Sequence, residues 1–183
     1  IVDHEMIVVG TDGGYIEAPF DTDRLTISPG ERYSVLVHAT GAPGRRYEIR
    51  NFRESSGLAT DPLGMGGQVV ATLEYGTDRR DDSQPQFSAD IERFTAAPTA
   101  NFTWRLGGME MEDGQIALTI NGETWPNVTP VHLKGNTRTT LRIINNTMLR
   151  HPMHLHGQRF QVTNVSGEMV PYSAWKDTVD VWP

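Results

Sequence analysis

Apolar residues in this chain recur at every second position in short runs, and this alternation constrains its fold more than any other feature. Side chains of a β-strand point alternately to two faces, so the pattern is typical of half-buried strands. No window carries the i, i+3, i+4, i+7 apolar stripe of an amphipathic helix. The alternating runs are Tyr33/Val35/Val37, Val69–Leu73, Ile116/Leu118/Ile120, Leu141/Ile143, Phe160/Val162 and Val179/Val181.

Turn-forming residues separate these runs. Gly, Pro, Asn, Asp and Ser supply the backbone conformations that tight turns require. The turns are predicted at Asp12-Gly13-Gly14, Ser28-Pro29-Gly30, Gly107-Gly108, Asn121-Gly122 and Ser166-Gly167. Short alternating strands between such turns predict an all-β sandwich.

The alternation breaks between Gly76 and about Ala100. Residues 77–86 are charged or polar, as expected of a solvated connection. We therefore predict two β units, over 1–76 and 100–183, joined by a linker over 77–99; the alternative is a long exposed loop inside one domain. The chain opens in a strand-like run and closes without a polar tail, so we expect both ends to continue into further sequence.

Charge and cysteine content exclude several functions. The formal net charge is -7 with no run of Lys or Arg, which argues against a nucleic-acid or anionic-membrane partner. Nothing approaches the roughly 20 apolar residues of a membrane span. The chain has no cysteine, so it cannot by itself form a disulfide, a thiolate metal site or a thiol nucleophile.

Three of the six histidines lie in one heptapeptide, His151-Pro152-Met153-His154-Leu155-His156-Gly157. On a strand, His154 and His156 share a face, whereas His151 tends toward the other. Neutral imidazole binds Cu, Zn, Fe and Ni, and clustered imidazoles favour copper on intrinsic affinity. We therefore predict a metal site here, with one strand able to serve two centres.

Two other interpretations of the heptapeptide remain open. The histidines could be incidental, or all three could gather on one Zn or Fe in a cupin-like β-barrel. A cupin would require a Glu a few residues later, where this chain has Phe160 and Gln161. The isolated His4, His38 and His132 are predicted to lie outside any site.

Three segments carry a family resemblance. His151–Phe160 resembles the His-Pro-x-His-x-His-Gly-x-x-Phe signature in the last cupredoxin domain of three-domain multicopper oxidases, the laccase-like enzymes. Ile120–Pro126 resembles the Ile-Asn-Gly-x-x-Trp-Pro strand and turn of that family, and Lys176–Val179 resembles its Lys-Asp-Thr-Val segment. The resemblance is strong over 100–183 and looser over 1–76.

The resemblance implies a cupredoxin-like Greek-key β-sandwich with copper centres. Residues 1–76 would be the closing half of a second domain, and 100–183 the first part of the C-terminal copper-binding domain. His151 would be a type 1 ligand, His154 a type 2 ligand and His156 a type 3 ligand. Such an enzyme couples one-electron oxidation of a phenol or metal ion to four-electron reduction of O2 to water.

The family also needs groups that this chain lacks. They are an N-terminal domain with further His pairs and a C-terminal His-Cys-His segment, which would be the partners of this chain. We therefore expect an internal part of a multicopper oxidase, inactive alone and extracytoplasmic as the family implies. The alternative is a non-catalytic cupredoxin-like binding or scaffold protein.

Overall fold

The computed structural model describes residues 1–52, 67–78, 89–95, 97, 99–111 and 114–183. Every regular element in these ranges is a β-strand, which confirms the predicted all-β class. No helix in the described part of the chain is long and apolar enough to cross a membrane. Residues 79–88, 96 and 98 of the predicted linker lie outside the described ranges, and the proposed division at 77–99 stays a prediction.

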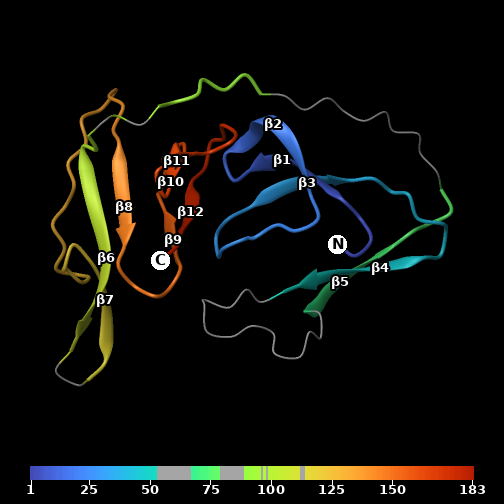
Figure 1. Cartoon of the computed structure of the whole chain (residues 1–183), viewed down its shortest axis with the longest axis horizontal. Coiled ribbons are helices and arrows are strands. Elements are labelled where there is room, and N and C mark those ends of the chain that lie inside the picture. The colour runs from blue at the N-terminus through green and yellow to red at the C-terminus, as the bar shows by residue number, and fades with distance from the viewer. Residues whose placement is uncertain (53–66, 79–88, 96, 98, 112–113) are drawn as a thin grey trace.

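The N-terminal part forms two small antiparallel sheets (Figure 1). β1 (Met6–Thr11) lies between β2 (Gly14–Thr22) and β3 (Tyr33–Val37). The predicted turn at Asp12-Gly13-Gly14 joins β1 to β2 as a hairpin. β4 (Arg46–Asn51) pairs with β5 (Gln68–Glu74) in the second sheet.

The C-terminal part contains three further sheets. β6 (Phe102–Glu110) lies between β7 (Ile116–Ile120), which is antiparallel to it, and β8 (Leu141–Asn145), which is parallel. β9 (His151–His154) pairs with β12 (Thr178–Val181), and β10 (Asn164–Val165) pairs with β11 (Glu168–Met169). In Figure 1 the β9–β12 region lies between the β6–β8 sheet and the β1–β3 sheet.

Two predictions about local structure were wrong. Phe160/Val162 is not a strand; Phe160 makes only an isolated bridge with Lys176. Gly107-Gly108 is not a turn but the middle of β6, paired with Thr119 and Leu118. A Cβ at Gly108 would lie 3.1 Å from Cγ2 of Ile116, so the strand is glycine-rich where a neighbouring side chain approaches its backbone.

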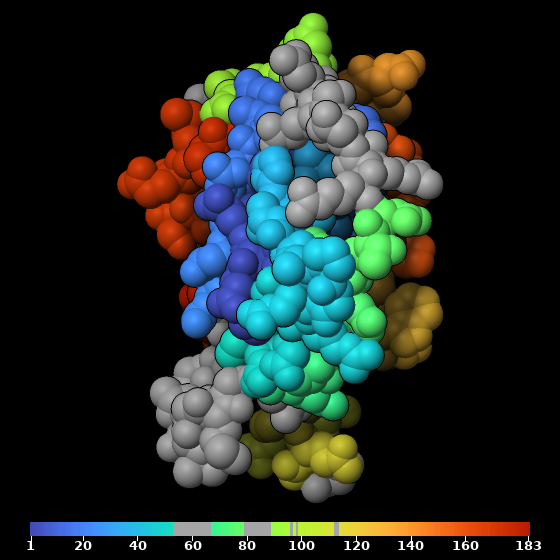
Figure 2. Space-filling model, turned by 90° about the vertical axis from the view of Figure 1, so that its right-hand side faces the viewer, coloured from blue at the N-terminus to red at the C-terminus, as the bar shows by residue number. Residues whose placement is uncertain are grey.

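The buried core joins the two parts of the chain. Val8 and Ile16 of the β1–β2 hairpin are fully buried and cluster with Ala174 from the segment before β12. Phe20 stacks on Tyr172 in the same cluster. Figure 2 shows this proximity at the surface, where blue N-terminal residues adjoin red C-terminal ones. The β9–β12 region is therefore held by hydrophobic contacts with the N-terminal sheet.

The β6–β8 sheet exposes its apolar face. Ile116 and Leu118, at alternate positions of β7, are 65% and 54% exposed, and the nearby Trp125 is 85% exposed. The polar Thr119, which follows Leu118 and points to the opposite face of the strand, is buried. The alternation in this run thus predicts a strand correctly, but no described residue covers its apolar side.

Candidate metal centre

The predicted histidine ligands lie on β9 and on the turn that follows it. His151 begins β9 opposite Val181 of β12, and His154 ends it opposite Thr178. Burial alternates along the strand, with His151 half-buried and His154 exposed, so the two imidazoles belong to opposite faces. The strand ends before His156, which lies in a turn next to Gly157 at a φ of 71°.

The turn brings His156 to His154 although the strand does not continue that far. The two ring centroids are 4.8 Å apart with an interplanar angle of 63°. The backbone N–H of Leu155, between them, donates to the carbonyl oxygen of Asp177 at 2.9 Å. The structure thus places His154 and His156 together and His151 apart from them.

The hydrogen bonds of His154 determine which of its nitrogens can bind a metal. Nδ1 lies 2.9 Å from the carbonyl oxygen of Asp177 and 3.0 Å from Oγ1 of Thr178. The carbonyl can only accept, and the Thr178 hydroxyl proton is donated to Oδ1 of Asp177 at 2.8 Å. Both partners therefore accept from Nδ1–H, and the neutral ring keeps an unprotonated Nε2 as a ligand.

His151 has the opposite arrangement. Its Nε2 lies 2.6 Å from Oγ1 of Thr147. The Thr147 hydroxyl donates to Oδ1 of Asn145 at 2.8 Å, so it accepts from Nε2–H of His151. This leaves Nδ1 of His151 unprotonated in the neutral ring. One short strand therefore presents two imidazoles with different nitrogens available, toward different faces.

The segment opposite β9 is rich in charge. Arg32 donates to both carboxylate oxygens of Asp177, at 2.8 and 2.7 Å. This guanidinium holds the pKa of the Asp177 carboxyl well below its usual range. At the other end of β12, Arg150 pairs with Asp180 and lies 4.1 Å over the ring of Trp182.

The donor set fits copper but is incomplete. Imidazole nitrogens suit copper, and two of the three rings have their non-ligating nitrogen hydrogen-bonded as metal-binding histidines require. Among the described residues, no group of three or more His, Asp or Glu side chains is arranged to hold a metal ion. Each centre would therefore need ligands from outside this set.

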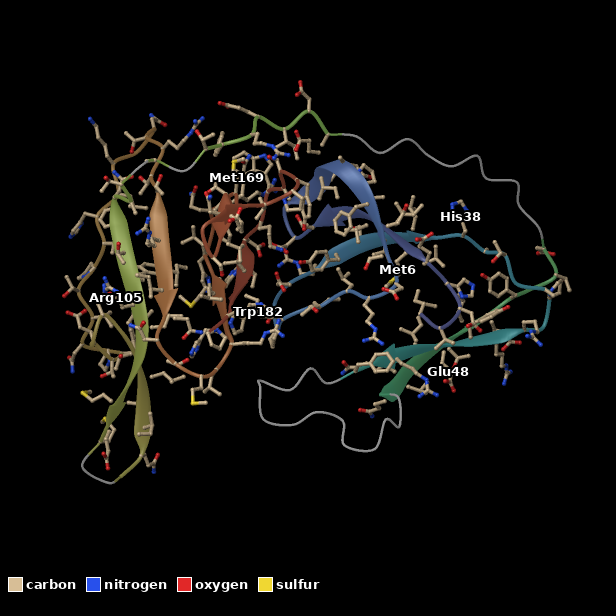
Figure 3. All side chains as sticks on the ribbon, viewed as in Figure 1. Met6, His38, Glu48, Arg105, Met169 and Trp182 are labelled. Carbon is tan, nitrogen blue, oxygen red and sulfur yellow. The ribbon has the colours of Figure 1, made fainter. Side chains whose placement is uncertain are left out.

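The other three histidines have different surroundings, and their place outside the site stays a prediction. His4 is buried, with Nδ1 2.8 Å from the Val2 carbonyl oxygen and Nε2 2.6 Å from the hydroxyl of Tyr75. His38 lies in the N-terminal part of the molecule, away from β9 (Figure 3), and His132 is exposed. The supporting residues Asp12, Arg32 and Thr147 were not predicted. Asp12 and Arg32 reach Asp177 only across the fold, where no local motif marks the contact, and Thr147, four residues before His151, carries no motif that marks it as a support.

Comparison with known proteins gives the family. Two family models described as multicopper oxidase match residues 1–78 and 87–183. The multicopper oxidase MmcO of Mycobacterium tuberculosis is 34% identical over 98% of this chain and 35% of its own length. The laccase of Bacillus subtilis is 26% identical over 96% and 38%. Cell division protein FtsP of Salmonella typhimurium is 27% identical over 94% and 36%. The chain thus spans about a third of the length of these relatives.

Solved structures confirm the fold. A multicopper oxidase from Campylobacter jejuni, titled a metallo-oxidase, matches all of this chain and 42% of its own with a TM-score of 0.65 at 19% identity. Fet3p, a multicopper oxidase that functions in iron import, matches all of this chain and 45% of its own with a TM-score of 0.65 at 20% identity. These likenesses support the predicted cupredoxin-like fold. The family model that matches residues 87–183 covers more than half of this chain, and the chain therefore belongs to the multicopper oxidase family.

Proposed function

We propose that this chain is part of a multicopper oxidase that couples one-electron oxidation of a phenol or metal ion to reduction of O2. Four substrate electrons and four protons would convert one O2 to two water molecules. The observation that carries the proposal is the arrangement of β9, where His151 and His154 present unprotonated nitrogens toward opposite faces. Such a strand can serve an electron-entry centre and an oxygen-reducing centre at a fixed separation.

Each histidine has a proposed role. His151 would be the type 1 ligand, His154 a type 2 ligand and His156 a type 3 ligand, which agrees with the pairing of the last two rings. When bound, copper would supply one-electron redox chemistry at these positions. The chain's own contribution is orientation, because Thr147 holds the ring of His151, and Asp177 with Thr178 holds that of His154.

Other segments of a longer polypeptide would complete the centres. No cysteine is present among the 183 residues, so a type 1 thiolate would come from elsewhere. The exposed apolar side chains of β7 offer a surface that further strands of the same polypeptide would cover. We therefore propose that this chain alone is inactive. From its membership of the family, we also propose that the oxidase is extracytoplasmic, as a periplasmic or secreted protein.

A second candidate is a non-catalytic binding or scaffold protein with the same fold. The observation that favours it is the 27% identical relative named a cell division protein rather than an oxidase. The retained cluster of His151, His154 and His156 favours the oxidase, because a scaffold has no need of oriented metal ligands. The cupin-like interpretation is discarded, since the chain belongs to another family.

The proposal is tested on the complete polypeptide that carries these residues. We would measure copper per chain, the visible thiolate-to-copper charge-transfer band, and O2 uptake with a phenol, with Cu⁺ and with Fe²⁺. The oxidase predicts several copper ions per chain, a blue band and substrate-dependent O2 uptake. A colourless protein that takes up no copper would overturn the proposal in favour of the scaffold.

A further inference from the structure

We propose that Asp12, on the hairpin turn between β1 and β2, is a positioning residue for His154. It acts through the backbone of Asp177 and Thr178, across the interface between the N-terminal and C-terminal parts of the chain. The inference rests on the proposed function, because it concerns the ligand assigned to type 2 copper.

The carboxylate of Asp12 is fully buried at this interface. Its Oδ2 accepts hydrogen bonds from the backbone N–H groups of Asp177 at 2.6 Å and Thr178 at 3.1 Å. Its Oδ1 accepts from Nζ of Lys176 at 3.0 Å. One carboxylate therefore fixes three consecutive residues that lie more than 160 positions away in the sequence.

Two of these three residues, Asp177 and Thr178, hold the imidazole of His154. Asp177 supplies its carbonyl oxygen and Thr178 its hydroxyl to Nδ1 of the ring. The two acceptors belong to the same residues whose backbone N–H groups are hydrogen-bonded to Asp12. A shift of this backbone would therefore move both acceptors together. Loss of the hydrogen bonds from Asp12 would therefore change the orientation of His154 and weaken the preference for its tautomer with an unprotonated Nε2.

The turn that carries Asp12 packs tightly against the backbone of Trp175, so it can act as a rigid support. A Cβ on Gly13 would lie 1.9 Å from the carbonyl oxygen of Trp175, so only glycine allows this approach. Oγ1 of Thr11 donates to the same carbonyl oxygen at 2.9 Å. On the other side, Nη1 of Arg159 donates to the carbonyl oxygen of Gly13 at 3.1 Å.

The chain offers a matched control in Glu17. Its Oε2 also accepts a backbone N–H across the interface, from Ser173 at 3.0 Å, and pairs with Arg93 at 2.6 Å. Ser173 is four positions before Asp177, and Glu17 makes no contact with the residues that hold His154 in the described part of the chain. A purely structural interface carboxylate should therefore behave like Glu17.

The test compares Asp12→Asn with Glu17→Gln in the complete, copper-loaded polypeptide. Asn retains one oxygen acceptor but presents an NH2 group either to Lys176 or to the backbone N–H groups, so the three contacts cannot all persist. For Asp12→Asn we expect the type 2 electron paramagnetic resonance signal to change and the affinity for that copper to fall by about 10- to 100-fold. The visible band from the His151 centre should stay unchanged, as should both signals in Glu17→Gln.

Two results would overturn the inference. The first is a wild-type type 2 signal and copper content in Asp12→Asn. The second is an equal loss of both signals in Asp12→Asn and Glu17→Gln, which would indicate only a general structural role.

A metal-free measurement separates this inference from the proposed function. In copper-depleted protein labelled with ¹⁵N-histidine, the ring nitrogens of His154 report the tautomer directly. We expect an Nδ1–H tautomer in wild type and Glu17→Gln, and a shift toward mixed tautomers in Asp12→Asn. Wild-type protein without any copper site would refute the proposed function, whereas an unchanged His154 tautomer in Asp12→Asn would refute the positioning role. If Asp12→Asn does not fold, Asp12→Glu provides the same comparison with the charge retained and the carboxylate displaced.

Discussion

The hydroxyl of Thr147 controls one ring nitrogen of His151 and therefore the donor strength of the other. A hydrogen-bond acceptor on Nε2–H makes the imidazole a more basic ligand. Thr147→Val removes this acceptor at 2.6 Å. In the complete oxidase we expect the reduction potential of the type 1 centre to rise by the equivalent of about 1 kcal/mol, the net contribution of one hydrogen bond. A redox titration followed at the visible band measures it.

The control for this prediction is Thr137→Val. Thr137 also donates a hydroxyl hydrogen bond, to the Lys134 carbonyl oxygen at 2.6 Å, but it is exposed and follows a turn far from His151 in the sequence. Its replacement should leave the potential unchanged, and Thr147→Ser should restore the wild-type value. An unchanged potential in Thr147→Val would contradict the assigned role of this hydroxyl.

Gly13 is required by the close approach of two backbones rather than by its own conformational freedom. An added methyl group would meet the carbonyl oxygen of Trp175 at 1.9 Å, and a backbone cannot yield as a flexible side chain can. We expect Gly13→Ala to lower the free energy of unfolding by about 1–3 kcal/mol or more, as overpacking does. Denaturant unfolding measures the loss. Gly76→Ala meets no atom within 4 Å and should have little effect; similar losses in both variants would refute the argument.

The sequence identifies the histidines but not their supports, for a physical reason. His151, His154 and His156 fall in one heptapeptide, so their spacing alone relates them. Asp12 and Asp177 come together only when the β1–β2 hairpin packs against the segment before β12. Local patterns carry no record of such a contact.

At the scale of single elements, the alternation of apolar residues predicts most strands correctly, including β7, whose apolar face no described residue covers. Five of the six predicted alternating runs form strands, namely β3, β5, β7, β8 and β12. Phe160/Val162 does not, because only Phe160 finds a backbone partner there. β6 was missed because its glycines resemble a turn, although each has a partner in β7. The exposed face of β7 shows that alternation fixes the period of a strand and not what covers it.

β2 contributes a fully buried apolar side chain to the interface. Ile16 has no exposed surface and packs in the cluster that includes Val8 and Ala174. We expect Ile16→Ala to lower the free energy of unfolding by about 2–5 kcal/mol, from lost burial and the cavity left behind. Ile27→Ala, at a position 54% exposed, should change it far less. Equal effects on the denaturation midpoint would show that this cluster does not stabilise the interface.

At the scale of the whole molecule, paired carboxylates make the contact between the two parts sensitive to acid. Burial alone would raise the pKa of Asp12, but the Asp177 N–H and the Lys176 ammonium outweigh it, and the pKa lies below 3.8. Arg32 and Glu31 also adjoin this group, through the Asp12 carbonyl oxygen and Lys176. The hydrogen bonds of Glu17 with Arg93 and the Ser173 N–H lower its pKa from 4.5.

Both pKa values are lower in the folded state than in the unfolded state, where they are 3.8 for Asp12 and 4.5 for Glu17. The two carboxylates therefore stabilise the folded state fully when the pH is above these unfolded values. Their contribution is lost as the pH falls through the folded values. We therefore expect the denaturant midpoint to fall steadily below about pH 5. The double variant Asp12→Asn with Glu17→Gln should be less stable than wild type at neutral pH, and its midpoint should depend less on acid over the same range. Parallel midpoint curves for the two proteins would mean that acid acts through other groups, and that these contacts do not couple the two parts of the chain.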